Sequence, residues 1–145
     1  MLPNNLMRCL WQDRRGQSAV ESALILLVLL TTLIGIFDLG QLLFIHQSFV
    51  ERVRHAARYA VVNSYDPVAF KNMVLYRQLT VPEGATSGIF GLTAGMVTVT
   101  RPGVGTNDER IVVSITSYPY RFFTPLIAGA FVGRNITVSL PSEIP

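Results

Sequence analysis

The chain has 145 residues, half of them hydrophobic and only 14% charged, with a mean hydropathy of +0.40. This length and composition fit a small membrane protein and leave room for one exported domain. The formal net charge is +3, of which residues 1–16 carry +2, because Arg8, Arg14 and Arg15 outnumber Asp13 there. The other cations are interleaved with acids, so the sequence lacks the basic stripe that nucleic-acid binding requires.

A basic junction precedes a long apolar run. The junction consists of Arg14, Arg15, Gly16 and Gln17. One acid, Glu21, stands near the start of the run, and the sixteen residues from Ser22 to Phe37 carry no charge. Sixteen helical residues span about 24 Å, less than a hydrocarbon core of about 30 Å. The helix must therefore continue through the mostly apolar residues 39–45, which predicts a membrane span over residues 17–45.

A cleaved secretory signal peptide is the first alternative, since it also joins a basic start to an apolar core. The run here is longer than such a core, no Ala-x-Ala site closes it, and helical periodicity continues beyond it. The arginine pair before the span favours a cytoplasmic N-terminus, although Arg52, Arg54 and Arg58 follow the span and weaken the charge bias. Cys9, the single cysteine, precedes the span, so the exported part cannot form an internal disulfide.

Beyond the span, the pattern predicts that the same helix continues to about Val62, starting from about Gln17. Its apolar stripe comprises Leu42, Ile45, Phe49, Val53, Ala56 and Ala60, with polar residues largely opposite. The residues 63–67 end this helix, and Asp66 before Pro67 is a good cap for a second one. The second helix presents Phe70, Met73 and Val74 inward, and the breaker residues 81–84 end it.

The rest of the chain alternates between apolar and polar residues. Residues 96–100, 110–117 and 135–140 read as three strands, with Gly103-Val104-Gly105 as a hairpin connection. A small antiparallel sheet of these strands buries one face against the long helix. Residues 118–133 form an apolar connection that either covers the core or meets a partner. The predicted fold class is α+β, a long N-terminal membrane-spanning helix continuing into a small domain with a short helix and a three-stranded antiparallel sheet.

Several features occur in a fixed order along the chain: the Gly16 junction, Glu21, the leucine-rich helix, the Phe37–Gln41 segment, the Ala56–Val61 stretch and the β-rich tail. Together they resemble TadE-like minor pilins, or pseudopilins, of tight-adherence (Flp-type) pilus systems. The resemblance spans most of the chain. The chain departs from the family at Ser22, where an aromatic often follows the glutamate.

The resemblance implies a prepilin that is cleaved between Gly16 and Gln17 by a dedicated aspartyl prepilin peptidase and takes part in assembling or priming an adhesion pilus. The implied partners are this peptidase, the major pilin and other minor pilins, the inner-membrane assembly platform and membrane lipid. The domains are then a basic cytoplasmic leader (residues 1–16), the membrane part of the helix (residues 17–45) and an extracytoplasmic α+β domain (residues 46–145) of a single-pass inner-membrane protein.

The position of Glu21 has a chemical rationale. Cleavage would create an amine at Gln17, four residues away on the same helical face. Within a low-dielectric bundle the two charges compensate, whereas an uncompensated charge costs several kcal/mol. Glu21 is therefore predicted to align an incoming subunit through its own amine or a neighbour's. The plainer alternative is an acid in the first helical turn, stabilised by the helix macrodipole.

Asp38 permits two hypotheses. A carboxylate near membrane depth is a candidate for pairing with an arginine of another pilin, but the length of the span also allows a solvated position among the headgroups.

An enzymatic function finds little support in the sequence. His46 and His55 are nine residues apart, so they do not share a helical face as a metal-binding pair would. We predict a structural protein that is not an enzyme and needs no cofactor or metal. The main rival is an uncleaved, signal-anchored scaffold of a secretion or assembly complex.

Overall fold

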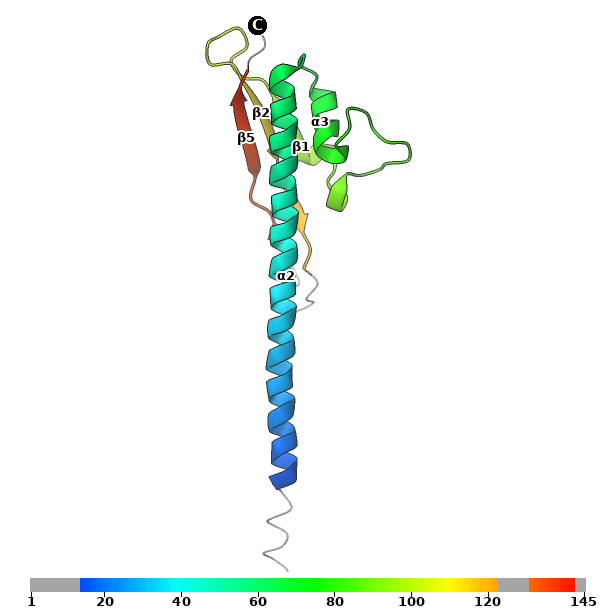
Figure 1. Ribbon diagram of the computed structural model, residues 1–145, viewed down its shortest axis with the longest axis vertical. Coiled ribbons are helices and arrows are strands. Elements are labelled where there is room, and N and C mark those ends of the chain that lie inside the picture. Colours follow the sequence, from blue (N-terminus) through cyan, green and yellow to red (C-terminus); the bar gives the residue numbers. More distant parts are fainter. Residues whose placement is uncertain (1–13, 123–130, 143–145) are drawn as a thin grey trace, which may run out of the picture. The chain divides into compact units, whose positions relative to one another are not determined.

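A computed structural model describes residues 14–122 and 131–142 of the chain (Figure 1). Its elements, in chain order, are helices α2 (Arg14–Val62) and α3 (Pro67–Tyr76), the 3-10 turns η1 (Ile89–Gly91) and η2 (Ala94–Met96), and strands β1 (Val97–Thr100), β2 (Arg110–Ile115), β3 (Pro119–Tyr120), β4 (Phe131–Val132) and β5 (Ile136–Pro141). The chain divides into two compact units, one up to Gly40 and one from Gln41. The predicted α+β class is confirmed.

Helix α2 is 49 residues long and ends at Val62, as the sequence pattern predicts. It begins at Arg14, three residues before the predicted start at Gln17. Arginine and glutamine are good helix formers, and the single Gly16 costs only about 1 kcal/mol relative to alanine. The junction between Gly16 and Gln17 therefore lies inside the first turns of the helix in the uncleaved chain.

The core of the second unit is built on the predicted stripe of α2. Ile45, Phe49 and Val53 are buried, and Leu42 packs against the core from a half-buried position. Three alanines complete the buried face: Ala56, Ala57 and Ala60. Because these side chains are small, the helix axis can approach its neighbours closely over this stretch.

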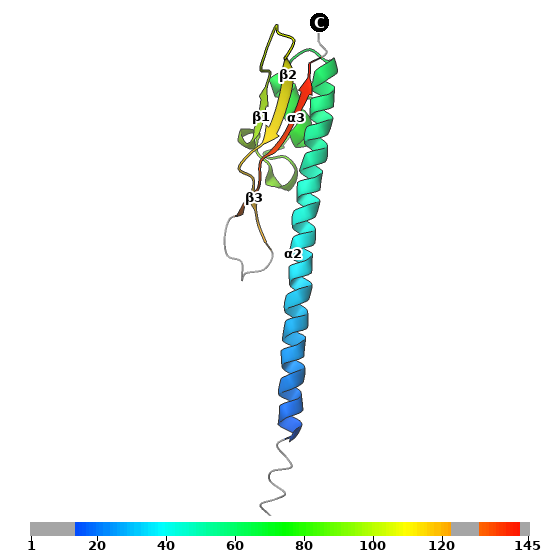
Figure 2. The ribbon, with the colours of Figure 1, turned by 90° about the vertical axis from the view of Figure 1, so that its left-hand side faces the viewer.

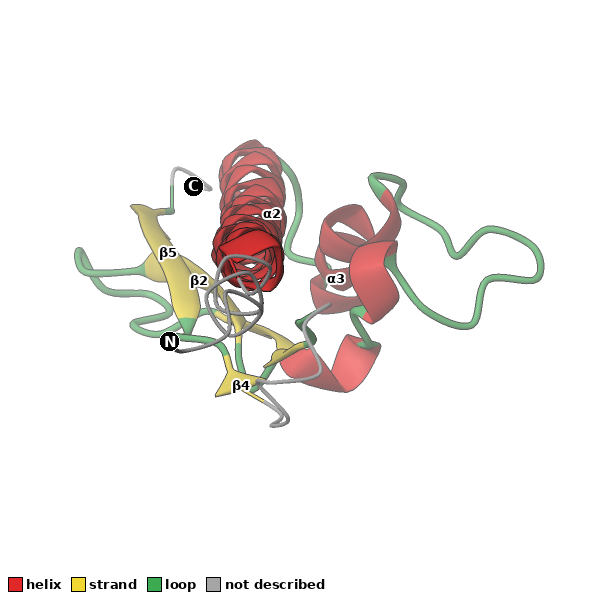
Figure 3. Cartoon of the chain, turned by 90° about the horizontal axis from the view of Figure 1, so that it is seen from below, coloured by secondary structure: helices red, strands yellow, loops and turns green. Residues whose placement is uncertain are grey.

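The main sheet has the order β1-β2-β5 and is antiparallel throughout. Its register aligns apolar residues across the strands, so that Val97 and Ile136 both pair with Ile115. Val99 and Val138 pair with Val113 in the same way. Figures 2 and 3 show that α3 and the C-terminal part of α2 cover the same face of this sheet. The predicted single buried face is confirmed.

Helix α3 starts as predicted. Asp66 Oδ1 accepts hydrogen bonds from the backbone N–H groups of Val68 (2.9 Å) and Ala69 (3.1 Å), and Pro67 occupies the first turn. These bonds satisfy donors that a helix start leaves unpaired.

The predicted end of this helix at residues 81–84 is wrong. Helix α3 ends at Tyr76, because Arg77 adopts a left-handed conformation (φ 59°) and its N–H bonds to the Met73 carbonyl at 3.0 Å. The Asn72 side chain then donates to the Leu79 carbonyl at 2.9 Å and holds the turn that follows. These local contacts, and not the later breaker residues, close the helix.

Four further elements are absent from the sequence prediction. Strands β3 and β4 pair as a separate two-stranded sheet, with Tyr120 opposite Phe131. Each has only two residues, too few to show alternation. The turns η1 and η2 occupy a stretch predicted as loop. Residues 123–130 of the apolar connection lie outside the described residues. The predicted hairpin connection at Gly103 is confirmed: its φ is 76°, and its carbonyl accepts a hydrogen bond from the Thr106 N–H at 2.9 Å.

Arg52 links α2 to the end of α3. Its Nη1 donates to the carbonyls of Val74 (3.2 Å) and Leu75 (3.1 Å), which belong to the last turn of α3. A cation near the C-terminal end of α3 also interacts favourably with the negative pole of its helix dipole. Burial lowers the pKa of Arg52, and the neighbouring charge of Arg77 lowers it further. The group remains a guanidinium at neutral pH because its ordinary pKa is so high.

We expect Val53→Ala to destabilise the domain by about 2 kcal/mol, from lost burial and the cavity left behind. Val62→Ala is the matched control, because Val62 lies on the same helix with 71% of its surface exposed. Urea unfolding of the full chain in detergent, followed by near-ultraviolet circular dichroism, measures the difference. Equal midpoints for the two variants would contradict the assigned core.

Arg52→Met should cost about 1–3 kcal/mol, because it leaves buried carbonyls of α3 without their donor. Arg54→Met is its control: Arg54 is exposed on the same helix and pairs only with Glu51 at 3.4 Å. Such surface pairs contribute at most about 1 kcal/mol. The same unfolding assay applies, and a loss for Arg54→Met as large as that for Arg52→Met would refute the linking role.

Candidate functional site

The first unit presents an apolar helical surface. Within α2, every residue from Gly16 to Gly40 is exposed except Asp38. The helix from Gly16 to Val62 is long and apolar enough to cross a membrane, and its most apolar 18-residue window has a mean hydropathy of 2.4 with no residue buried. A helix that is apolar on all sides belongs in lipid or in a bundle with other helices.

Three hydroxyl side chains within this surface form hydrogen bonds to the helix itself. Ser22 donates to the Ser18 carbonyl (2.9 Å), Thr31 to the Leu27 carbonyl (2.8 Å) and Thr32 to the Val28 carbonyl (2.8 Å). Each bond reaches back four residues, an arrangement in which hydroxyl groups bond to their own helix. These three side chains therefore need no water, which suits a hydrocarbon environment.

The predicted cleavage junction lies at the N-terminal end of this surface. Arg14 and Arg15 begin α2, and Gly16 and Gln17 follow in the same turn. Gly16 is exposed, and a Cβ atom added there would meet nothing within 4 Å in the part of the chain that the structure describes. The fold of the chain itself therefore does not require glycine at position 16.

Glu21 is exposed one helical turn beyond Gln17. Among residues 14–122 and 131–142, its carboxylate has no ion-pair or hydrogen-bond partner. The structure thus places Gly16, Gln17 and Glu21 on two consecutive turns of one helix, with the carboxylate accessible to another molecule. Arg8 and Cys9 of the predicted leader lie outside the described residues.

Asp38 differs from its neighbours. It is only 4% exposed, whereas Phe37 and Leu39 are 64% and 61% exposed. A carboxylate is stable in a buried position only where other groups pair with it. Asp38 is therefore not a freely solvated surface acid in this structure, a result that its place in the sequence did not indicate. Its pairing with another subunit stays a prediction.

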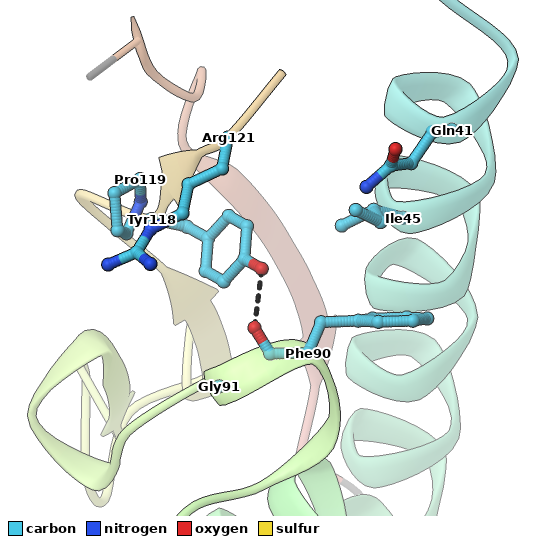
Figure 4. Close-up of a pocket in the computed structure, with 7 residues that line it drawn as sticks. All are labelled: Gln41, Ile45, Phe90, Gly91, Tyr118, Pro119 and Arg121. Carbon is cyan, nitrogen blue, oxygen red and sulfur yellow. Dashed lines mark hydrogen bonds between the residues drawn. The ribbon is translucent and has the colours of Figure 1, made fainter. Parts of the chain in front are cut away.

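The second unit contains a cavity of about 420 Å³ (Figure 4). Figure 4 shows Gln41 and Ile45 of α2 facing Tyr118, whose hydroxyl donates to the Phe90 carbonyl at 2.6 Å. Burial raises the pKa of Tyr118, and the nearby Tyr120 adds to this effect, while Arg121 opposes it. Tyr118 is therefore protonated at neutral pH, as a donor must be. This bond anchors η1 beside β3.

No group of three or more His, Cys, Asp or Glu side chains in the described ranges could hold a metal ion. His46 is half-buried and His55 is exposed on α2.

Residues 16–58 match the family model described as TadE-like protein. The match begins at the Gly16 junction and includes the apolar surface, Glu21, Asp38 and most of the part of α2 that packs in the domain core. The sheet and α3 lie beyond it. No curated protein and no solved structure matches the chain. The resemblance recognised in the sequence is confirmed by this match.

Proposed function

We propose that this chain, which is TadE-like and so associated with Tad pilus systems, is a minor pilin that a prepilin peptidase cleaves between Gly16 and Gln17 and that takes part in assembling or priming the pilus. The observation that carries the proposal is the family match beginning at Gly16 and continuing through an exposed apolar helix that bears an accessible Glu21. The apolar helix fits a membrane-anchored protein.

The junction lies near the start of α2, where a peptidase can reach the peptide bond at a low cost in free energy. The first four N–H groups of any helix have no intrahelical partner, and helix ends open with little free energy. Gly16 is the third residue of α2, so only the first turns must unwind for a peptidase to reach the bond. Glycine at this place lowers the cost of unwinding by about 1 kcal/mol relative to alanine.

Cleavage then changes the electrostatics of the helix start. The new amine at Gln17 adds a positive charge to the positive pole of the helix dipole, which is unfavourable. The carboxylate of Glu21 lies one turn away and offsets this charge. In the membrane, where unpaired charges are costly, the accessible carboxylate of one subunit and the amine of another attract each other and fix the axial register of the two helices.

The same proposal assigns orientation and partners. Arg14 and Arg15 hold the N-terminus on the cytoplasmic side of the inner membrane, and the α+β domain lies on the other side. The partners are the prepilin peptidase, the major pilin and other minor pilins, the assembly platform and membrane lipid. The protein acts as a structural subunit and not as an enzyme.

One observation favours a second candidate, the uncleaved signal-anchored scaffold. Helix α2 runs without a break from Arg14 through the Gly16 junction. An uncleaved scaffold keeps this helix as it stands, whereas cleavage requires the first turns to unwind before the bond is reached. The two candidates differ in one measurable property, the N-terminus of the protein in the membrane.

The intact mass of the membrane-bound protein, measured with and without the peptidase, tests the cleavage. We expect a mature chain beginning at Gln17 only when the peptidase is present. Gly16→Leu should retain the leader, whereas Gly35→Leu, a control with equally open surroundings in the described structure, should be processed normally. A chain that keeps residues 1–16 under both conditions would support the scaffold instead.

Glu21→Gln tests the subunit alignment. We expect about tenfold fewer assembled pili, corresponding to a loss of roughly 1.4 kcal/mol in subunit docking, with processing and membrane insertion unchanged. The control is Glu51→Gln, which removes an exposed acid from the domain part of the same helix. Pilus counts by electron microscopy give the result. Normal piliation in Glu21→Gln, or the same defect in Glu51→Gln, would argue against the proposed role.

A further inference from the structure

A second cavity in the domain, of about 370 Å³, lies where α2 passes the end of α3 and the turn η1. From α2 it is lined by Phe44, Gln47, Ser48, Glu51 and Arg52, and from the other elements by Arg77 and Ile89. Two of these side chains are guanidinium groups. The lining thus combines a cationic part, formed by Arg52 and Arg77, with an apolar part, formed by Phe44 and Ile89.

Neither guanidinium group of this cavity forms an ion pair with a residue that the structure describes, and with Glu51 counted the lining carries a net positive charge. Arg52 uses Nη1 for its two carbonyl acceptors, which leaves its Nε and Nη2 donors available. The Arg77 side chain has no hydrogen bond or ion pair within the described ranges. Glu51 is the acid in the lining, and its Oε1 is directed to Arg54 at 3.4 Å. The two guanidinium groups repel each other, as the effect of Arg77 on the pKa of Arg52 indicates.

The backbone conformation at Arg77 does not require arginine. Arg77 has a φ of 59° at the C-cap of α3, a conformation for which glycine or asparagine is the usual residue. A cation at this end is favourable for the dipole of α3, but asparagine would hold the same backbone conformation. Arginine here places a second guanidinium group in the cavity beside Arg52.

The position of the cavity along α2 indicates which kind of anion the two guanidinium groups would bind. Phe44 is 65% exposed and lies next to Ile45, the end of the predicted span, where aromatic side chains accumulate at membrane interfaces. Arg52 follows Ile45 by seven residues, about 10 Å along the helix axis. Helical side chains tilt back toward the N-terminus, which brings the guanidinium closer to the headgroup layer, about 5–8 Å thick on each side of the hydrocarbon core.

We propose that this cavity binds the phosphate of an anionic phospholipid, held by the guanidinium groups of Arg52 and Arg77, while Phe44 contacts the apolar part of the lipid. Guanidinium donors match phosphate oxygens in pairs. The inference depends on the membrane span of α2 and is independent of cleavage after Gly16 and of pilus assembly. A failure of the lipid test therefore leaves the proposed function untouched. A failure of the cleavage or pilus-assembly test likewise leaves the lipid site untouched.

Native mass spectrometry of the full-length protein in neutral detergent, titrated with phosphatidylglycerol, tests the site. We expect one tightly bound phosphatidylglycerol and weak binding of phosphatidylcholine. Inorganic phosphate, added at equal concentration, should not displace the lipid. Equal binding of the two lipids would overturn the proposal. Displacement of the lipid by inorganic phosphate would also overturn it, since the cavity would then be a site for soluble anions.

Arg77→Asn is the decisive variant, because asparagine tolerates the left-handed conformation and the Arg77 side chain makes no contact that the described fold requires. We expect about fivefold weaker phosphatidylglycerol binding, the usual effect of one arginine near an anionic surface. Arg58→Gln removes an exposed charge of the same helix outside the cavity and should bind as the wild type does. Unchanged phosphatidylglycerol affinity in Arg77→Asn would refute the lipid assignment. So would a variant that loses binding to a protein partner and keeps its binding to the lipid.

Discussion

The domain depends on the contact between the C-terminal part of α2 and one face of the sheet. Phe49 and Val53 are completely buried in this contact, and the register of the strands sets Val113 and Ile115 in the same core. Tyr118 packs its ring on Phe49 with the ring centres 4.6 Å apart. Because the domain has no cysteine, this packing must supply the stability that disulfides give to many small exported domains.

A single helix thus meets two different requirements along its length. From Gly16 to Gly40 the side chains are mostly apolar and all except Asp38 are exposed, and the hydroxyl groups of Ser22, Thr31 and Thr32 bond to the helix itself. From Gln41 onward the apolar residues narrow to one stripe, and charged residues take the opposite face. The family match covers both patterns. The residues matched by the family model are therefore the apolar part of α2 together with most of the part that packs in the domain core.

Local patterns were sufficient to predict the stripe of α2, the cap at Asp66 and the three main strands, because helical and strand periodicities are visible in neighbouring residues. Some features that escaped prediction depend on contacts distant in sequence, and others on a local backbone conformation that the residue type does not favour. Arg52 reaches carbonyls more than twenty residues away, the left-handed Arg77 ends α3 early, and Asp38 is buried. At the candidate site, the order of Gly16, Gln17 and Glu21 was readable from sequence, whereas the cationic cavity required the fold.

The sheet ends on β5, which among the described residues pairs only with β2. Its residues from Ile136 to Leu140 carry no charge, and proline appears only at its last position, Pro141. Charges and prolines are the devices by which proteins protect an edge strand against pairing with other chains. The β5 edge can therefore accept a strand from another chain, and Thr137→Lys or Ser139→Lys, both at exposed positions, would place a charge on it that opposes such pairing.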